Sequence, residues 1–148
     1  MRVLIVCTGN TCRSPMAAAL MRRALDAAGL ADVAVESAGI FAREGDPATS
    51  EAIFAMAERG VNLSGHRARA LRRDMLPGAL VLCMTERQVR DVKRLEKSAD
   101  ARRIAEYAGL SGDISDPYGG TLDCYRRTAG LLDDCARRIA AKLADEHG

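Results

Sequence analysis

The sequence contains no tryptophan and has only two phenylalanines and three tyrosines among its 148 residues. Its core must therefore be built mainly from alanine, leucine, valine, isoleucine and methionine. No apolar run approaches the roughly 20 residues that a membrane-spanning helix needs, so we expect no membrane segment. The formal net charge is only +2, which gives no reason to expect nucleic acid or a membrane surface as a partner.

Cysteine is present, but not in a pattern typical of disulfides or zinc. Five cysteines are an odd number without the spacing of a disulfide framework, and no C-x-x-C pair accompanies the two histidines. We therefore expect no metal and no organic cofactor, and at least one thiol with a chemical role. Residues 1–6 are too short for a secretion signal and run into a glycine turn, so we expect a cytoplasmic protein.

Short apolar runs alternate with helical patterns along the chain. Strands are predicted at 2–6, 33–35 and 79–84, and helices at 14–28, 47–59, 85–94 and 121–146, while 102–107 fits either an edge strand or part of a helix. Ser14 is predicted to cap the first long helix, and Asp46-Pro47 to open the second. This alternation predicts an α/β sandwich around a parallel sheet, as a single domain over residues 1–148.

The segment from Cys7 to Arg13 lies between the first strand and the first helix. Its spacing forces a tight loop, residues 8–12, whose backbone N–H groups can surround an anion beside the positive end of the helix. We call residues 8–12 the phosphate loop. Arg13 can donate two hydrogen bonds to phosphate oxygens, and the same positive field favours the thiolate of Cys7. A thiolate facing a bound phosphorus atom is a nucleophile.

A simpler interpretation is that Gly9-Asn10 is an ordinary turn and Cys7 a buried thiol. The preceding strand, the Ser14-Pro15 helix start and the Gly9-Asn10 pair all favour the phosphate loop over that interpretation. The G-x-x-x-x-G-K-S/T pattern of nucleoside-triphosphate loops is absent.

Four motifs follow one another along the chain: Cys7-Thr8-Gly9-Asn10-Thr11-Cys12-Arg13-Ser14-Pro15, Ser37-Ala38-Gly39, His66-Arg67-Ala68-Arg69 and Asp116-Pro117-Tyr118-Gly119-Gly120. In this order they resemble the low-molecular-weight protein tyrosine phosphatase family over nearly the whole chain. The resemblance implies a four-stranded parallel sheet flanked by helices on both faces, a Rossmann-like three-layer sandwich. It also implies a cysteine phosphatase that forms a phosphocysteine intermediate.

The resemblance assigns roles to residues outside the loop. Asp116 would protonate the leaving group and later deprotonate water, although Ser115-Asp116-Pro117 also fits an ordinary turn. Ser14 would donate to the Cys7 thiolate, and Ser37 and His66 would support Asn10, which would take a left-handed conformation. The residues expected to bind the substrate are Thr8, Gly9, Asn10, Thr11, Cys12, Ser14 and Tyr118.

The remaining cysteines have two expected fates. Cys12 is either a packing residue or a partner that forms a disulfide with Cys7 under peroxide and so protects it from over-oxidation. Cys83, Cys124 and Cys135 lie in strand or helix patterns and are expected to be core thiols.

Thr11 is the position that bears on the substrate. Tyrosine-directed members usually carry a bulky aliphatic residue here, whereas a threonine resembles the bacterial protein-arginine phosphatase branch. Its small side chain and hydroxyl suit a guanidinium group, which brings several N–H donors. The sequence therefore favours phosphoarginine in proteins as the substrate, with phosphotyrosine as the alternative and a monomer as the expected state.

Two rival functions remain. A thiol-dependent arsenate reductase would need two further cysteines on one flexible segment, and the cysteine that follows Cys83 is Cys124. A phosphate-binding module without catalysis would need neither a nucleophile nor an acid, so the set Cys7, Arg13 and Asp116 argues against it.

Overall fold

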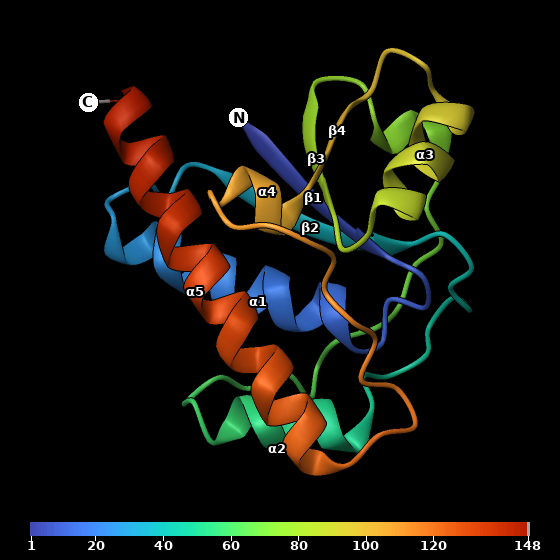
Figure 1. The fold of residues 1–148 in the computed structure, drawn as a ribbon, viewed down its shortest axis with the longest axis vertical. Helices are drawn as coiled ribbons and strands as arrows, with labels where there is room; N and C mark the ends of the chain where they lie inside the picture. Colours follow the sequence, from blue (N-terminus) through green and yellow to red (C-terminus); the bar gives the residue numbers. More distant parts are fainter. Residues whose placement is uncertain (148) are drawn as a thin grey trace.

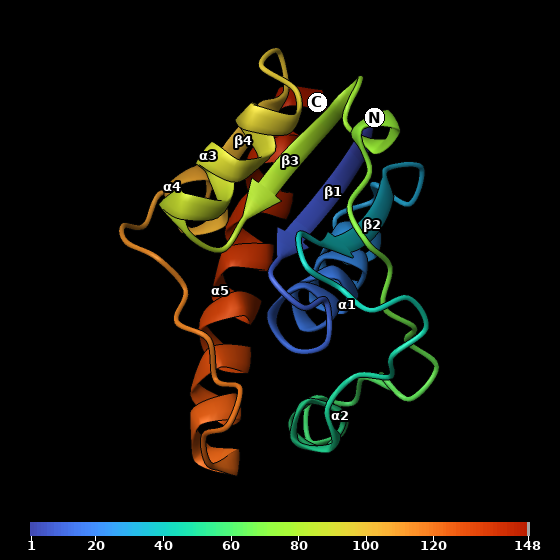
Figure 2. The same cartoon turned by 90° about the vertical axis from the view of Figure 1, so that its right-hand side faces the viewer.

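The parallel sheet holds the amino-terminal strand at its centre. In the computed structural model, which describes residues 1–147, the strands β1 (Arg2–Cys7), β2 (Ala34–Gly39), β3 (Ala79–Cys83) and β4 (Asp100–Arg103) form a four-stranded parallel sheet in the order β2-β1-β3-β4. The arrowheads of β1, β2 and β3 point to the same edge (Figure 2). Cys7 ends β1 at this edge, opposite Gly39 of β2.

Helices cover both faces of the sheet (Figure 1). The larger core cluster joins one face to α1 (Arg13–Ala27), α2 (Ser50–Ala57), α4 (Ile104–Tyr107) and α5 (Leu122–His147). The smaller cluster joins the other face to α3 (Glu86–Leu95) and the short 3-10 helix η1 (Arg73–Met75). Side chains along β1 alternate between the two clusters, so β1 is buried on both sides, as its continuous apolar sequence requires.

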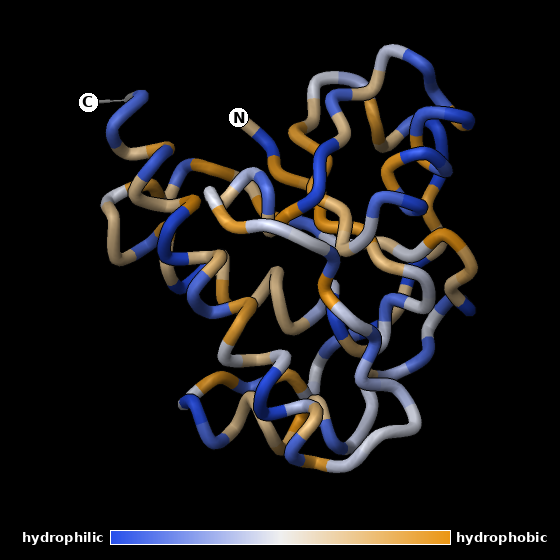
Figure 3. Tube along the Cα trace, in the orientation of Figure 1, coloured by the Kyte–Doolittle hydropathy of each residue, from blue (hydrophilic) through white to orange (hydrophobic). Residues whose placement is uncertain are grey.

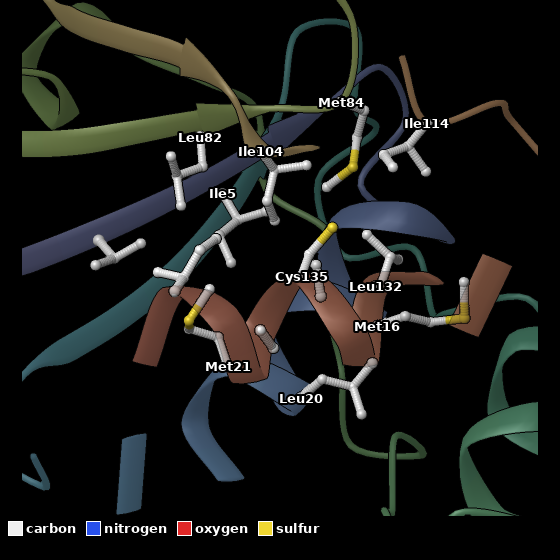
Figure 4. Packing of buried hydrophobic residues seen from close by; sticks show 14 of the residues in the cluster. Ile5, Met16, Leu20, Met21, Leu82, Met84, Ile104, Ile114, Leu132 and Cys135 are labelled. Carbon is white, nitrogen blue, oxygen red and sulfur yellow. The ribbon is translucent and has the colours of Figure 1, made fainter. Parts of the chain in front are cut away.

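Small and flexible side chains fill this core in place of aromatic rings. Ile5 and Leu82 of the sheet lie between the strands and α5, near Leu132 and Cys135 (Figure 4). Along α5 the chain alternates between hydrophobic and hydrophilic residues, because one side of the helix faces the core (Figure 3). No helix within residues 1–147 has the length and apolar character needed to cross a membrane.

The predicted α/β fold is confirmed, and so is the four-stranded sheet that the family resemblance implied. The segment 102–107 divides between the two expected alternatives, because it contains the end of β4 followed at once by α4.

Two predicted helix starts are wrong. The first helix begins at Arg13 with Cys12 before it, and Ser14 lies inside the helix, where its hydroxyl contacts Cys7 and Asn10 and does not cap. The second begins only at Ser50, where the Thr49 side chain accepts a hydrogen bond from the Ala52 N–H at 3.2 Å.

Asp46-Pro47 does not open this helix because backbone pairing holds it in an extended segment. The N–H of Gly45 donates to the Ala68 carbonyl at 2.8 Å, and the N–H of Ala68 donates back to the Asp46 carbonyl at 2.7 Å. The Asp46 carbonyl therefore accepts a hydrogen bond from a distant segment, and it does not accept the first hydrogen bond of a helix.

The expectation of three core thiols is correct for Cys83 and Cys135, which are both 0% exposed. Burial raises the pKa of the Cys83 thiol to about 12 and that of Cys135 to about 11. The expectation of a core thiol is wrong for Cys124, which is partly exposed near the start of α5. Hydrogen bonds from Thr121, the largest influence, lower the pKa of this thiol.

Candidate active site

The Cys7 thiol lies at the base of the phosphate loop, where β1 gives way to α1. Its side chain is buried, with the residue 3% exposed. The Asn10 N–H donates to Cys7 Sγ at 3.3 Å, and Ser14 Oγ lies 2.9 Å from the same sulfur. Two polar groups therefore meet the sulfur from within the protein.

Asn10 holds the loop in shape. It has a φ of +56°, a left-handed conformation that asparagine tolerates better than most residues, and it is 0% exposed. Its Oδ1 accepts the Arg69 N–H at 3.0 Å, so its Nδ2 must face Ser14 Oγ at 2.7 Å and Ser37 Oγ at 3.0 Å. His66 Nε2 lies 2.6 Å from the Asn10 carbonyl oxygen.

This arrangement sets the direction of the Ser14 hydroxyl. Because Ser14 Oγ accepts from the Asn10 amide, its own hydrogen is available for Cys7 Sγ. Ser14 can therefore donate to a thiolate at Cys7. The expected cluster of Ser14, Ser37 and His66 around Asn10 is present, and the backbone of Arg69 joins it.

Two further residues support the loop, and sequence reasoning missed both. A Cβ atom on Gly39 would lie 2.6 Å from the Thr8 carbonyl oxygen and 2.9 Å from the Asn10 nitrogen, so only glycine lets the end of β2 approach the loop this closely. From the other side Gln88 Nε2 donates to Thr8 Oγ1 at 3.1 Å. Thr85 and Gln88 form a capping box that the sequence could have revealed, although its contact with Thr8 could not be foreseen.

Arg13 joins the loop to the segment that carries Asp116. The arginine is 4% exposed, and its Nη1 donates to the Ile114 carbonyl at 2.8 Å. Its Nη2 lies 3.5 Å from Asp116 Oδ2, while Asp116 Oδ1 accepts the Tyr118 N–H at 3.0 Å. The guanidinium has five N–H donors, so this anchoring leaves donors for a bound anion.

These residues surround a cavity of about 430 Å³, lined by Cys7, Thr8, Gly9, Thr11, Cys12, Arg13, Phe41, Arg43, Asp46, Pro47, Thr49, Asp116 and Tyr118. Two aromatic side chains form exposed parts of its wall, since Phe41 is 80% and Tyr118 72% exposed. Asn10 and Ser14 are fully buried behind the loop, and neither lines the cavity. One wall of the cavity was not predicted, because it comes from a loop that is distant in the sequence. This wall consists of Phe41, Arg43, Asp46, Pro47 and Thr49.

The Cys12 side chain contacts α5 and the segment just before α2. Its Sγ lies 3.5 Å from the Tyr125 hydroxyl and 3.7 Å from Thr49 Oγ1. Burial raises the pKa of the Cys12 thiol, and these hydrogen bonds oppose the effect only in part.

The described residues, 1–147, contain no group of three or more His, Cys, Asp or Glu side chains that could hold a metal ion.

Comparison with known proteins identifies the family. Residues 2–147 match the family described as low molecular weight phosphotyrosine protein phosphatase. The chain belongs to this family. A protein-arginine-phosphatase of Geobacillus stearothermophilus is 40% identical over 149 residues, covering 98% of this chain and 97% of that protein.

Solved structures of the family agree in fold. A mutant of the arginine phosphatase YwlE with a phosphorylated active-site serine has a TM-score of 0.88 at 36% identity, over 97% of this chain and 95% of that chain. A low molecular weight protein tyrosine phosphatase from T. tengcongensis has a TM-score of 0.90 at 43% identity, over 96% of this chain and 99% of that chain. The predicted family and its resemblance to the arginine phosphatases are confirmed.

The partly buried contact of His66 with Asn10 predicts a pH dependence of stability. Burial lowers the pKa of His66 below its ordinary value, and the bond to the Asn10 carbonyl only partly opposes this. Below about pH 6.5 the unfolded chain takes up this proton more readily than the folded protein, so the free energy of unfolding should fall as the pH drops. In urea titrations, His66→Gln should weaken this loss between about pH 7.5 and about pH 5.5. Identical pH profiles for both proteins would contradict the assignment.

Proposed function

We propose that this protein is a cysteine phosphatase that hydrolyses phosphoarginine in proteins, with Cys7 as the nucleophile. The observation that carries the proposal is the meeting of Cys7, Arg13 and Asp116 in one cavity at the carboxyl edge of the sheet. A thiol, a cation and a carboxylate are the three groups that phosphoryl transfer through a covalent intermediate requires.

In the first step the Cys7 thiolate attacks phosphorus. The loop N–H groups and Arg13 hold the phosphoryl oxygens and offset their charge, so they act where a metal ion acts in other phosphatases. Asp116, in its acid form, gives its proton to the leaving nitrogen as the P–N bond breaks and the P–S bond forms. The proton is essential because a guanidine is too basic to leave as an anion.

In the second step water replaces the sulfur. The Asp116 carboxylate takes a proton from the water as its oxygen attacks phosphorus, and the P–S bond breaks to return the Cys7 thiolate. The Ser14 hydroxyl, directed to Cys7 Sγ by Asn10, stabilises that thiolate as it leaves. Inorganic phosphate is released and Asp116 is again in its acid form.

The cavity supports arginine as the substrate residue. Thr11 lines it, and within the described residues the Thr11 hydroxyl has only a long contact of 3.9 Å, to Cys12 Sγ. A hydroxyl in this position can accept from a guanidino N–H, and Asp116 can accept from another. Phe41 and Tyr118 can stack on a planar guanidinium or on a phenyl ring, so these two residues do not discriminate between phosphoarginine and phosphotyrosine. Phosphotyrosine is the second candidate, since a relative named for that activity has the same fold.

Cys12 is proposed as a guard of the nucleophile. Peroxide would oxidise the Cys7 thiolate to a sulfenic acid. The Cys12 thiolate would then attack this sulfur, forming a disulfide and displacing hydroxide, which takes up a proton from solvent to become water. Because burial raises the pKa of Cys12, formation of the disulfide should become faster as the pH rises.

The role of Cys12 is tested by peroxide treatment followed by a thiol reductant. We expect the wild-type protein to recover its activity and Cys12→Ala to lose this recovery. Full recovery in the variant would refute the role.

A cytoplasmic monomer that acts on phosphorylated proteins completes the proposal, with the whole of residues 1–148 as one phosphatase domain. A reducing compartment suits an enzyme whose nucleophile is a free thiolate. The net charge of +2 gives no support for nucleic acid or a membrane surface as a partner.

The substrate assignment is tested by kcat/KM on matched phosphoarginine, phosphotyrosine and phosphoserine peptides. Wild-type protein should prefer phosphoarginine, and Thr11→Ile should shift the arginine-to-tyrosine ratio toward tyrosine by about 10-fold or more, because the added bulk crowds a guanidinium. Cys7→Ser serves as the control that must abolish turnover. An unchanged ratio in Thr11→Ile would place the specificity elsewhere, and a wild-type preference for phosphotyrosine would select the second candidate.

The role of Asp116 is tested by changing the leaving group. Asp116→Asn removes the proton but keeps the shape, so kcat on phosphoarginine peptides should fall by about 100-fold or more. Turnover of p-nitrophenyl phosphate should fall much less in its first step, because nitrophenolate leaves without a proton. Pre-steady-state release of nitrophenol measures that step directly. Equal losses on both substrates would show that Asp116 is not the acid.

A further inference from the structure

A second hollow lies beside the active-site cavity, and Phe41 lines both. It is a groove of about 440 Å³ lined by Ile40, Phe41, Leu71, Asp91, Arg94 and Leu95. Four of these six residues are apolar. Two of them are large apolar side chains that face solvent, since Phe41 is 80% and Leu95 39% exposed. Neighbouring exposed apolar side chains of this kind are typical of an interaction surface.

The floor of the groove packs against the core. Ile40 and Leu71 are partly buried and pack against the smaller core cluster, which also contains Val89 and Val92 of α3. The Leu71 N–H donates to the Gly39 carbonyl at 2.8 Å, which fixes the two floor segments side by side. The groove is therefore a shaped surface between the end of β2, the segment before η1 and the end of α3.

The wall between the groove and the cavity is tied to the phosphate loop. The Ile40 N–H donates to the Cys7 carbonyl at 3.0 Å, and the Phe41 N–H donates to the Thr8 carbonyl at 2.9 Å. The Phe41 backbone is thus fixed relative to the nucleophile, and a ligand that touches Phe41 from the groove side lies next to the active-site cavity. This continuity with the active site indicates what occupies the groove.

We propose that the groove docks the stretch of the protein substrate that adjoins the phosphoresidue, through one large apolar side chain of that stretch. A phosphoresidue in a protein continues into chain on both sides, and chain that leaves the cavity across Phe41 enters the groove. An apolar occupant fits better than a charged one, because Arg94 Nη1 lies 3.4 Å from Asp91 Oδ1 and these two charges satisfy each other. The proposal rests on the proposed function only in requiring a protein substrate, whether the phosphoresidue is arginine or tyrosine.

The test compares two leucines of nearly equal exposure. Leu95 lies in the groove and is 39% exposed, whereas Leu131 lies on α5, outside the groove, and is 41% exposed. The substrates are phosphopeptides in which a single leucine replaces serine at successive positions, up to about four residues, or roughly 13 Å of extended chain, on either side. Each peptide is made with phosphoarginine and with phosphotyrosine, and p-nitrophenyl phosphate reports on the site itself.

In wild-type protein, leucine at one flanking position should raise kcat/KM by about 10-fold over serine, mainly through KM. Leu95→Ser should lose this gain, Leu95→Met should keep most of it, and Leu131→Ser should not change it. All variants should hydrolyse p-nitrophenyl phosphate as wild type does. The loss of the leucine gain in Leu95→Ser is the coupling that a direct contact predicts.

Three results would overturn the proposal: no flanking position that favours leucine, a leucine gain that persists in Leu95→Ser, or an equal loss on p-nitrophenyl phosphate in that variant. The last would mean that Leu95 acts on the site and not on the flanking chain. The proposed function fails in a different way. If only phosphotyrosine peptides are hydrolysed, the arginine assignment is wrong while the docking test proceeds on the tyrosine series.

Discussion

The side-chain amide of Asn10 is the interaction on which the site depends. A loop that turns its N–H groups inward around an anion needs a residue that accepts a left-handed conformation and a reason to stay there. Asn10 supplies both, because its buried amide binds Ser14 and Ser37 through Nδ2 and the backbone of Arg69 through Oδ1. A buried amide without partners would cost about 1–3 kcal/mol, so the surrounding segments and the loop stabilise each other.

The same amide connects conformation to chemistry. By occupying the Ser14 oxygen it directs the Ser14 hydrogen toward Cys7, so the shape of the loop and the hydrogen bond to the nucleophile have one cause. Gly39 of β2 and Gln88 of α3 brace the loop, and Arg13 joins it to the Asp116 segment. Residues from all parts of the chain thus meet at the carboxyl edge of the sheet, where α/β proteins bind ligands.

The sequence predicted well what is encoded locally. The strand, loop and helix around Cys7 are adjacent in the chain, and the pattern of residue types there restricts the geometry strongly. The start of α2 was mispredicted because pairing with Ala68 outweighs the local preference of Asp46-Pro47. Gln88 and Phe41 were missed because their contact with the loop depends on tertiary packing, which no local pattern records.

Many bonds that fix the site end on the peptide backbone. Arg13 binds the carbonyl of Ile114, Asn10 binds the N–H of Arg69, and His66 binds the carbonyl of Asn10. A backbone group is the same whatever amino acid carries it. A substitution at position 69 or 114 therefore leaves the bonding backbone group in place, and the side chains there are constrained by other contacts, Arg69 by Ser37 and Glu36 and Ile114 by the core. The site itself therefore depends directly on only a few side chains, and the rest of its framework is supplied by the path of the backbone.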